Sequence, residues 1–495
     1  MHGSGEPSHK ITLTMFENLE PKALWANFAT LNAVPRPSKK EERVIAFIKN
    51  FGERLGLPTK VDDTGNVLIK KPASPGMEAR KPVVLQSHLD MVHQKNAGTD
   101  FNFDRQGIEM YVDGDWVKAR GTTLGADNGI GVAAIMTLLA SSDIPHPPLE
   151  ALFIIDEETG MTGAMGLKGG LLSAPILLNL DTEDDRELTI GCAGGVDVSA
   201  YGHYPEEATP AGRKAMAISL KGLTGGHSGM DIHLGRANAN KLMNRLLHGL
   251  SEKYGARIAS IDGGGLRNAI PRESAATVVV QARHEQSIEK QLGQWAEIFL
   301  TEYKTTDPGL SLSWEKVPVP QKVMSRTFQK KLLQAVYACP NGIYRLSPDV
   351  EGLVQTSNNL ARVLAQGGQY TLLCLTRSSV ESEKADLAAA IVSALGLAGI
   401  RAGLSGGYPG WAPHPDAVIV QLMSNLYEEM FGEKPHVNAC HAGLECGILG
   451  SHYPGMEMIS FGPNIRGAHS PDEMVQISSV QKFWRFLLET LKRTP

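Results

Sequence analysis

Three short apolar runs in this chain of 495 residues are each followed by side chains that can bind a metal ion or transfer a proton. These side chains are His88 and Asp90 after the first run, Glu157 and Glu158 after the second, and Asp181 after the third. Imidazole nitrogens and carboxylate oxygens together suit zinc and, less selectively, manganese or cobalt. The pattern therefore favours a metal site.

Two further candidate ligands lie outside these runs. Asp127 stands in a glycine-rich segment at the start of a predicted helix, and His469 lies in a turn-rich loop near the C-terminus. A carboxylate such as Asp127 can bridge two ions about 3.5–4 Å apart. Because side chains alternate along a strand end, the imidazole of His88 can bind a metal while the carboxylate of Asp90 orients it.

Each of these short motifs is by itself typical of a solvated loop at the end of a strand. The joint pattern changes the interpretation, because independent surface charges are not expected to follow three buried strands between residues 83 and 181. The runs at residues 83–85, 152–155 and 176–178 lack polar alternation, as strands buried on both faces do. In an open α/β sheet, ligands bind beyond the carboxyl ends of the strands, so the candidate ligands should converge there.

The chain is long enough for more than one domain. After residue 192, predicted strands at 214–220 and 275–281 alternate with predicted helices at 238–250 and 288–302, which indicates an α+β domain. We therefore expect an α/β catalytic domain with a mixed or parallel sheet, formed by residues 1–197 and 405–495. An inserted α+β lid or dimerisation domain, long enough for two similar halves, is expected at residues 198–404.

Charge and hydropathy exclude several classes of function. With 48 Lys and Arg against 53 Asp and Glu, the net charge is −5, and no block of like charge suggests a nucleic-acid partner. The longest almost wholly apolar stretch, residues 388–400, is shorter than the roughly 20 residues that a bilayer requires. Residues 1–21 do not read as a signal peptide. Five cysteines without a CxxC motif argue for a reducing cytoplasm.

A rival interpretation comes from Gly129, Gly131 and Ala134, which fit the GxGxxA pattern of dinucleotide-binding proteins. An NAD-dependent oxidoreductase is therefore an alternative. The preceding residues 116–124 are too polar for the buried first strand of that motif, and Asp127 would place a negative charge beside the pyrophosphate.

Several segments resemble motifs of the metallopeptidase family M20: 86–92 (QSHLDMV), 125–131 (GADNGIG), 156–160 (DEETG), 179–181 (NLD) and 467–473 (GAHSPDE). Longer segments are similar to its aminoacyl-histidine dipeptidase branch: 118–131 (KARGTTLGADNGIG), 191–195 (GCAGG), 266–273 (LRNAIPRE) and 441–447 (HAGLECG). The resemblance implies two Zn²⁺ ions per chain, with Mn²⁺ or Co²⁺ as substitutes. It also implies that His88 and Asp181 bind one ion, that Glu158 and His469 bind the other, and that Asp127 bridges the two. Asp90 would orient the His88 ring, and Glu157 would be the general base.

The resemblance also implies a role for His227, in the glycine-rich residues 222–229 of the inserted domain. The matching histidine in the family reaches the active site, often across a homodimer, and stabilises the oxyanion. A buried structural histidine is the ordinary alternative. Arg377 and Asn268 are candidates for contacts with the carboxylate or backbone of the substrate.

The activity implied is hydrolysis of small unblocked dipeptides, preferentially Xaa-His, with β-alanyl-histidine (carnosine) as a further candidate substrate. An aminoacylase or a broad-specificity dipeptidase of the same family is the alternative. A metal-binding scaffold without catalysis is disfavoured, because the candidate general base Glu157 is present. The expected enzyme is a cytoplasmic homodimer with no nucleic-acid or membrane partner.

Overall fold

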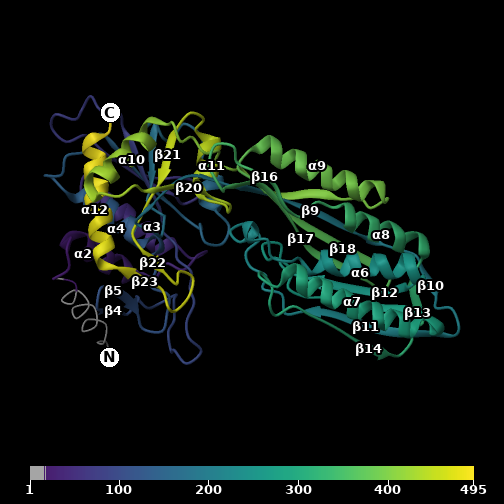
Figure 1. Ribbon diagram of the computed structural model, residues 1–495. Helices are drawn as coiled ribbons and strands as arrows, with labels where there is room; N and C mark the ends of the chain where they lie inside the picture. Colours follow the sequence, from purple (N-terminus) through teal and green to yellow (C-terminus); the bar gives the residue numbers. More distant parts are fainter. Residues whose placement is uncertain (1–15, 17) are drawn as a thin grey trace. The chain divides into compact units, whose positions relative to one another are not determined.

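The computed structural model describes residue 16 and residues 18–495, and the chain divides into two compact units (Figure 1). Unit 1 comprises the described residues up to 191 together with 413–439 and 445–495, and unit 2 comprises 192–412 and 440–444. The prediction about a signal peptide rests on residues 1–21, most of which lie outside the described part.

Unit 1 is built on an eight-stranded mixed sheet, which confirms the predicted α/β class. In spatial order its strands are β1 (Thr59–Val61), β2 (Val67–Lys71), β6 (Leu149–Ile154), β3 (Val83–His88), β7 (Ile176–Asn179), β21 (Glu457–Ser460), β8 (Glu187–Cys192) and β20 (His436–Cys440). The central strands β6, β3, β7 and β21 run parallel. The three predicted apolar runs are β3, β6 and β7, and every residue of these strands is buried.

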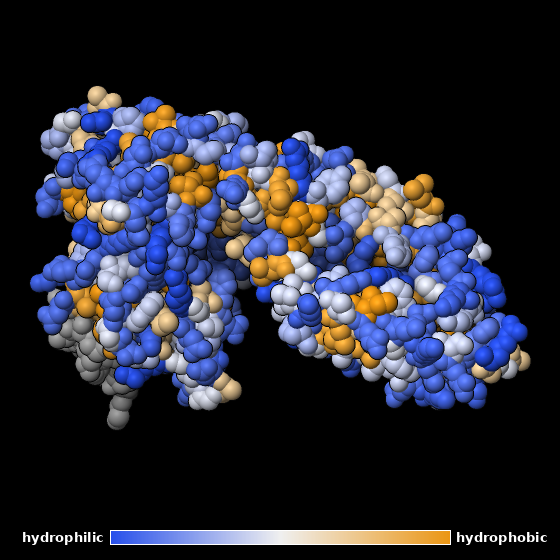
Figure 2. All heavy atoms as spheres, viewed as in Figure 1, coloured by the Kyte–Doolittle hydropathy of each residue, from blue (hydrophilic) through white to orange (hydrophobic). Residues whose placement is uncertain are grey.

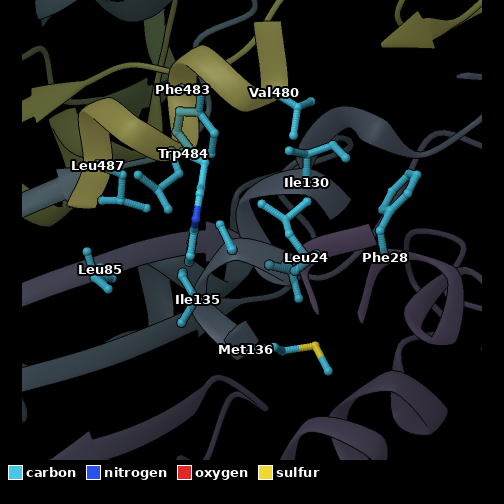
Figure 3. Packing of buried hydrophobic residues seen from close by; sticks show 14 of the residues in the cluster. Leu24, Phe28, Leu85, Ile130, Ile135, Met136, Val480, Phe483, Trp484 and Leu487 are labelled. Atoms are coloured by element: carbon cyan, nitrogen blue, oxygen red, sulfur yellow. The ribbon is translucent and has the colours of Figure 1, made fainter. Parts of the chain in front are cut away.

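The helices of unit 1 are α2 (Lys22–Asn32), α3 (Glu42–Arg54), α4 (Ala126–Ala140), α5 (Thr162–Gly166), α10 (Val418–Phe431), α11 (Glu445–His452) and α12 (Ile477–Arg493). Of these, α3, α4 and α10 contact strands of this sheet. Helix α4 is apolar around its whole circumference and therefore lies in the interior, where it contacts β3 and α2. Figure 3 shows its Ile130 and Ile135 among Leu24 of α2 and Phe483 of α12. Asp127 lies in the first turn of this buried helix, where the backbone of Asp127 and Asn128 departs from helical geometry.

A small four-stranded sheet completes unit 1. Its order is β22 (Ile465–Arg466), β23 (Met474–Gln476), β5 (Trp116–Ala119) and β4 (Met110–Asp113). Antiparallel pairing of β23 with β5 joins two parts of the chain that are more than 300 residues apart. The loop of His469 connects β22 to β23, and β5 leads toward Asp127, so this sheet brings two predicted ligands into one region.

Unit 2 is an antiparallel α+β structure with a nine-stranded sheet. The main order is β14 (Ser311–Val317), β11 (Arg213–Lys221), β13 (Ser274–Gln281), β12 (Arg257–Gly264), β17 (Val354–Gln366), β18 (Gln369–Ser378), β9 (Gly194–His203) and β19 (Gly403–Tyr408), with β16 (Gly342–Leu346) beside β17. Strands β10 (Glu206–Ala208) and β15 (Lys322–Met324) form a separate pair. The helices that pack on the large sheet are α6 (Ala239–Tyr254), α7 (Glu285–Tyr303), α8 (Arg326–Ala338) and α9 (Glu381–Leu397) (Figure 1).

The element order of unit 2 reveals an internal repeat. One half runs β11-α6-β12-β13-α7-β14 and the other runs β9-α8-β17-β18-α9-β19. The sheet places equivalent strands symmetrically about the antiparallel seam between β12 and β17. The first half is inserted between β9 and α8 of the second, so unit 2 contains two copies of a βαββαβ motif.

The boundaries of the units differ from the predicted ones. Strand β19 pairs with β9, so residues 405–412 belong to unit 2 rather than to the catalytic domain. Residues 440–444 also join unit 2, where the Ala193 N–H donates to the carbonyls of Cys440 and Ala442. Pairing between strands about 200 residues apart sets these boundaries, and local composition does not report it.

No helix in the described part of the chain is long and apolar enough to cross a membrane. Figure 2 shows hydrophilic residues over most of the viewed face, with scattered apolar residues on both units. Four of the five cysteines are buried, as packing residues are.

Candidate active site

The predicted ligands of unit 1 lie at one edge of its sheet. Strand β3 ends at His88, β6 ends four residues before Glu158, and β7 ends two residues before Asp181. Because β6, β3 and β7 are parallel neighbours, their carboxyl ends meet at the same edge. Asp127 and His469 reach this edge from the start of α4 and from the β22–β23 loop.

The five predicted ligands form two groups that share Asp127. In the first group, Nε2 of His88 lies 3.0 Å from Oδ1 of Asp127 and 3.4 Å from Oδ1 of Asp181. In the second group, Nε2 of His469 lies 3.3 Å from Oδ2 of Asp127 and 2.9 Å from Oε2 of Glu158. The two oxygens of one carboxylate therefore face separate histidines, which is the arrangement that a bridging ligand needs.

The electrostatics of both groups suit a cation. Burial lowers the pKa of His88, but the carboxylates of Asp181, Asp127 and Asp90 outweigh burial and raise this pKa well above the usual value. Hydrogen bonds to Asp127 and Glu158 raise the pKa of His469 to about 11. Oε1 of Glu158 is buried and has no hydrogen-bond partner among the described residues. An excess of carboxylate charge and an unsatisfied oxygen fit the binding of hard or borderline divalent ions.

Asp90 holds the His88 ring and the backbone of the adjacent glutamates in place. Its Oδ1 lies 3.4 Å from Nδ1 of His88, on the side of the ring opposite Asp127. The same carboxylate accepts hydrogen bonds from the backbone N–H groups of Glu157 and Glu158, and from the Ser38 hydroxyl. Asp90 thus orients the His88 ring and fixes the adjacent glutamates.

Glu157 and Glu158 occupy different environments although they are neighbours. Glu158 points toward His469, whereas the carboxylate of Glu157 lies within 4.8 Å of ligand atoms of His88 and Glu158. Burial and the nearby charges of Asp181, Glu445 and Glu158 raise the pKa of Glu157 well above its usual value. A carboxylate with a raised pKa is suited to accept a proton near neutral pH.

Sequence reasoning did not single out Glu445, the first residue of α11. Its carboxyl group is buried and accepts a hydrogen bond of 2.6 Å from Nε2 of Gln86. Burial raises the pKa of Glu445 to about 8. Glu445 lies in the family-like segment 441–447, but nothing in that segment assigns the carboxylate a role, and its hydrogen bond to Gln86 of β3 becomes visible only in the structure.

His227 lies in unit 2, on a loop that pairs with residues 268–270. Its Nδ1 accepts hydrogen bonds from the backbone N–H groups of Gly229 and Met230, at 3.2 and 3.0 Å. Burial and the charge of Arg377 lower the pKa of His227. The neutral ring must then carry its proton on Nε2, which is left as a hydrogen-bond donor.

Arg377 lies near the end of β18 in the same unit and is buried. Its Nη1 donates to the Tyr408 hydroxyl at 2.7 Å, and its Nε has no hydrogen-bond partner in the part of the chain that the structure describes. Buried His441, which the sequence analysis did not consider as a site residue, bonds the Ser357 hydroxyl at 2.7 Å. Burial, Arg377 and His227 lower the pKa of His441 to about 3.

Asn268 is exposed, and its carbonyl accepts the Ser228 N–H.

The structure contradicts the dinucleotide-binding alternative. Gly129, Gly131 and Ala134 lie inside α4 and are buried, whereas the glycines of a dinucleotide motif form the exposed turn between a strand and a helix. A Cβ at Gly131 would lie 2.1 Å from Oδ1 of Asn128 and 2.4 Å from Oγ of Ser87. This glycine therefore allows close packing of the helix.

Comparison with known proteins defines the class. Residues 84–493 match the model of peptidase family M20/M25/M40, and the chain belongs to this family of enzymes. The chain is 42% identical over 484 residues to the cytosol non-specific dipeptidase of Escherichia coli (strain K12), covering 98% of this chain and 100% of the relative. The crystal structure of aminoacylhistidine dipeptidase from Vibrio alginolyticus superposes with a TM-score of 0.93 at 44% identity, covering 97% of this chain and 98% of that chain. The aminopeptidase PepT of Bacillus cereus, at 15% identity and a TM-score of 0.55, shares the fold.

Proposed function

We propose that this protein is a metal-dependent dipeptidase that uses two Zn²⁺ ions, with Mn²⁺ or Co²⁺ as substitutes. The observation that carries the proposal is that Asp127 presents its two oxygens to two separate groups of ligands. His88 and Asp181 would hold one ion, Glu158 and His469 the other, and Asp127 both. When bound, such ions acidify a water molecule and polarise a peptide carbonyl.

In the proposed mechanism, Glu157 transfers a proton from the attacking water to the leaving group. Its carboxylate accepts a proton from the attacking water and then donates that proton to the leaving amine nitrogen. Asp90 keeps the His88 ring in place through Nδ1. No covalent intermediate with the protein is needed, because water is the nucleophile.

Unit 2 is proposed to act as a lid that completes the site. His227 would donate its Nε2–H to the oxyanion of the tetrahedral intermediate, because two backbone groups occupy Nδ1. Arg377 would bind the substrate carboxylate through its unpartnered Nε, and Asn268 would contact the substrate backbone. A buried guanidinium without a full set of partners is suited to such an anion.

The proposed substrates are unblocked dipeptides, with Xaa-His preferred and β-alanyl-histidine as a candidate. The relative from Vibrio alginolyticus, named an aminoacylhistidine dipeptidase, supports this preference. A broad-specificity dipeptidase is the second candidate, since the relative from Escherichia coli is named non-specific. The name of that relative also supports a cytoplasmic location, and a homodimer stays a prediction that light scattering of the purified protein would test.

The kcat/KM values for Ala-His, β-alanyl-histidine, Ala-Ala, an N-acetylated amino acid and a tetrapeptide decide among these functions. We expect Ala-His to be cleaved fastest. Equal rates for Ala-His and Ala-Ala would favour the broad-specificity enzyme, and preference for the acetylated compound would favour an aminoacylase. Comparable cleavage of the tetrapeptide would contradict a dipeptidase.

A further inference from the structure

Two buried charged residues lie next to the candidate metal centre. The proposed mechanism gives them no role. Arg36, between α2 and α3, is 1% exposed, and Glu473, directly before β23, is 3% exposed. In the described part of the chain neither forms an ion pair with a surface charge, and both bind backbone groups of the ligand-bearing segments. Nη2 of Arg36 also donates to Oδ1 of Asn32 at 2.9 Å. Burying both charges is costly unless their hydrogen bonds serve a purpose in the native state.

Glu473 holds the segment that carries Asp127. Its Oε2 accepts hydrogen bonds from the N–H groups of Leu124 and Gly125, at 2.7 and 2.9 Å. Its Oε1 accepts hydrogen bonds from the N–H groups of Ala126 and Asp127, at 2.8 and 3.2 Å. One carboxyl group therefore accepts hydrogen bonds from four consecutive N–H groups, two directly before α4 and two from its first residues, which have no partner within the helix.

The same contact ties Asp127 to His469. Glu473 lies four residues after His469 on the loop that ends at β23. A shift of this loop would therefore move His469 and the anchor of Asp127 together. His469 itself has a φ of 64°, in the left-handed region that non-glycine residues rarely adopt, so the loop depends on surrounding contacts for its conformation.

Arg36 holds the other side of the same peptide. Its Nη2 donates to the Gly125 carbonyl at 2.6 Å, and its Nη1 donates to the carbonyls of Leu89 and Asp90, at 3.1 and 3.0 Å. Arg36 thereby links the Asp127 segment to the end of β3, where His88 lies. Gly125 has a φ of 71°, and a Cβ there would lie 2.5 Å from Nη2 of Arg36, so the close approach requires glycine.

We propose that Glu473 and Arg36 are positioning residues that clamp the Gly125 peptide from both sides and align the segments of His88, Asp127 and His469 before a cation binds. This inference rests on the proposed metal site and deepens it. Asp127 must present one oxygen to each ligand group, so a small rotation of its backbone would spoil both groups at once. Loss of a residue that orients ligands typically weakens metal binding about 10–100-fold.

The first test is the Zn²⁺ affinity of Glu473→Gln, measured by competition with a chromophoric chelator. A glutamine has about the same shape but offers one acceptor oxygen to four N–H groups, so we expect Zn²⁺ to bind about 10–100-fold more weakly. Arg36→Lys, which lacks the forked geometry, should weaken binding in the same direction. The matched control is Asp472→Asn, an exposed neighbour of Glu473 on the same loop, which should bind Zn²⁺ like the wild type.

The wild type in this experiment separates the two hypotheses. Failure of the wild-type protein to bind Zn²⁺ would contradict the proposed function. Binding by the wild type with equal affinity in folded Glu473→Gln would contradict the clamp.

A second test needs no variant and applies even where Glu473→Gln does not fold. In metal-free wild-type protein, the amides of residues 124–127 should exchange with deuterium at least 100-fold more slowly than an unstructured chain, since Glu473 already holds them. Free exchange of these amides without metal, followed by protection on adding Zn²⁺, would overturn the proposal, because the ion rather than the clamp would then order the segment.

Discussion

Glu157 and Glu158 are adjacent, but we predict that substitution of Glu157 lowers kcat whereas substitution of Glu158 removes metal. Glu157→Gln should lower kcat by about 10²–10⁴-fold, because an amide cannot accept the proton of the attacking water. Its metal content should stay near that of the wild type. Glu158→Ala should instead lose metal, since Oε2 of Glu158 lies beside His469. Elemental analysis and steady-state kinetics check both variants. Loss of metal in Glu157→Gln and loss of kcat alone in Glu158→Ala would show that Glu157 is the ligand and Glu158 the general base.

For His227 we predict an effect on the transition state. His227→Ala should lower kcat by about 10²–10³-fold with little change in KM, because a donor to the oxyanion acts only after attack. His233→Ala is the matched control, since His233 is exposed in the short 3-10 helix (Ile232–Leu234) that follows the loop of His227 and has no proposed role. A normal kcat in His227→Ala would leave His227 with a structural role only.

At the scale of elements, α4 must pack closely against the ends of β3 and β7. A Cβ at Gly131 would collide with Asn128, Ser87 and the Leu180 carbonyl, all next to predicted ligands. We therefore expect Gly131→Ala to lower the free energy of unfolding by about 1–3 kcal/mol and to weaken metal binding. Gly293→Ala in α7 is the control: a Cβ there meets no atom within 4 Å, and the change should stabilise the protein by about 0.5–1 kcal/mol. Chemical denaturation measures both, and equal stability of the two variants would refute the packing argument.

For the whole molecule, we predict that activity depends on a pair of ions. A chelator should abolish dipeptide hydrolysis, and added Zn²⁺, Mn²⁺ or Co²⁺ should restore it. Elemental analysis of the active protein should give about two ions per chain, as the two ligand groups that share Asp127 indicate. Full activity in protein shown to contain no metal would rule out this mechanism.

The sequence alone determined the α/β class and the region of the site. The apolar runs at β3, β6 and β7 predict strands buried on both faces, and the carboxyl ends of such strands form the ligand-binding edge of an open α/β sheet. His88, Glu158 and Asp181 could therefore be predicted together from local patterns. The motifs around Asp127 and His469 were long enough to show the family resemblance, and the family match confirms that resemblance.

Only the tertiary structure decided how these groups are held. Glu473 and Arg36 form hydrogen bonds with backbone groups. Since residues of every type carry such groups, the sequence does not show which of them a buried side chain will bind. The edges of unit 2 likewise depend on β19 pairing with β9, and the repeat within unit 2 becomes visible only in the strand order. Contacts between residues hundreds of positions apart arise from packing and hydrogen bonding of the folded chain, so local pattern and composition cannot specify them.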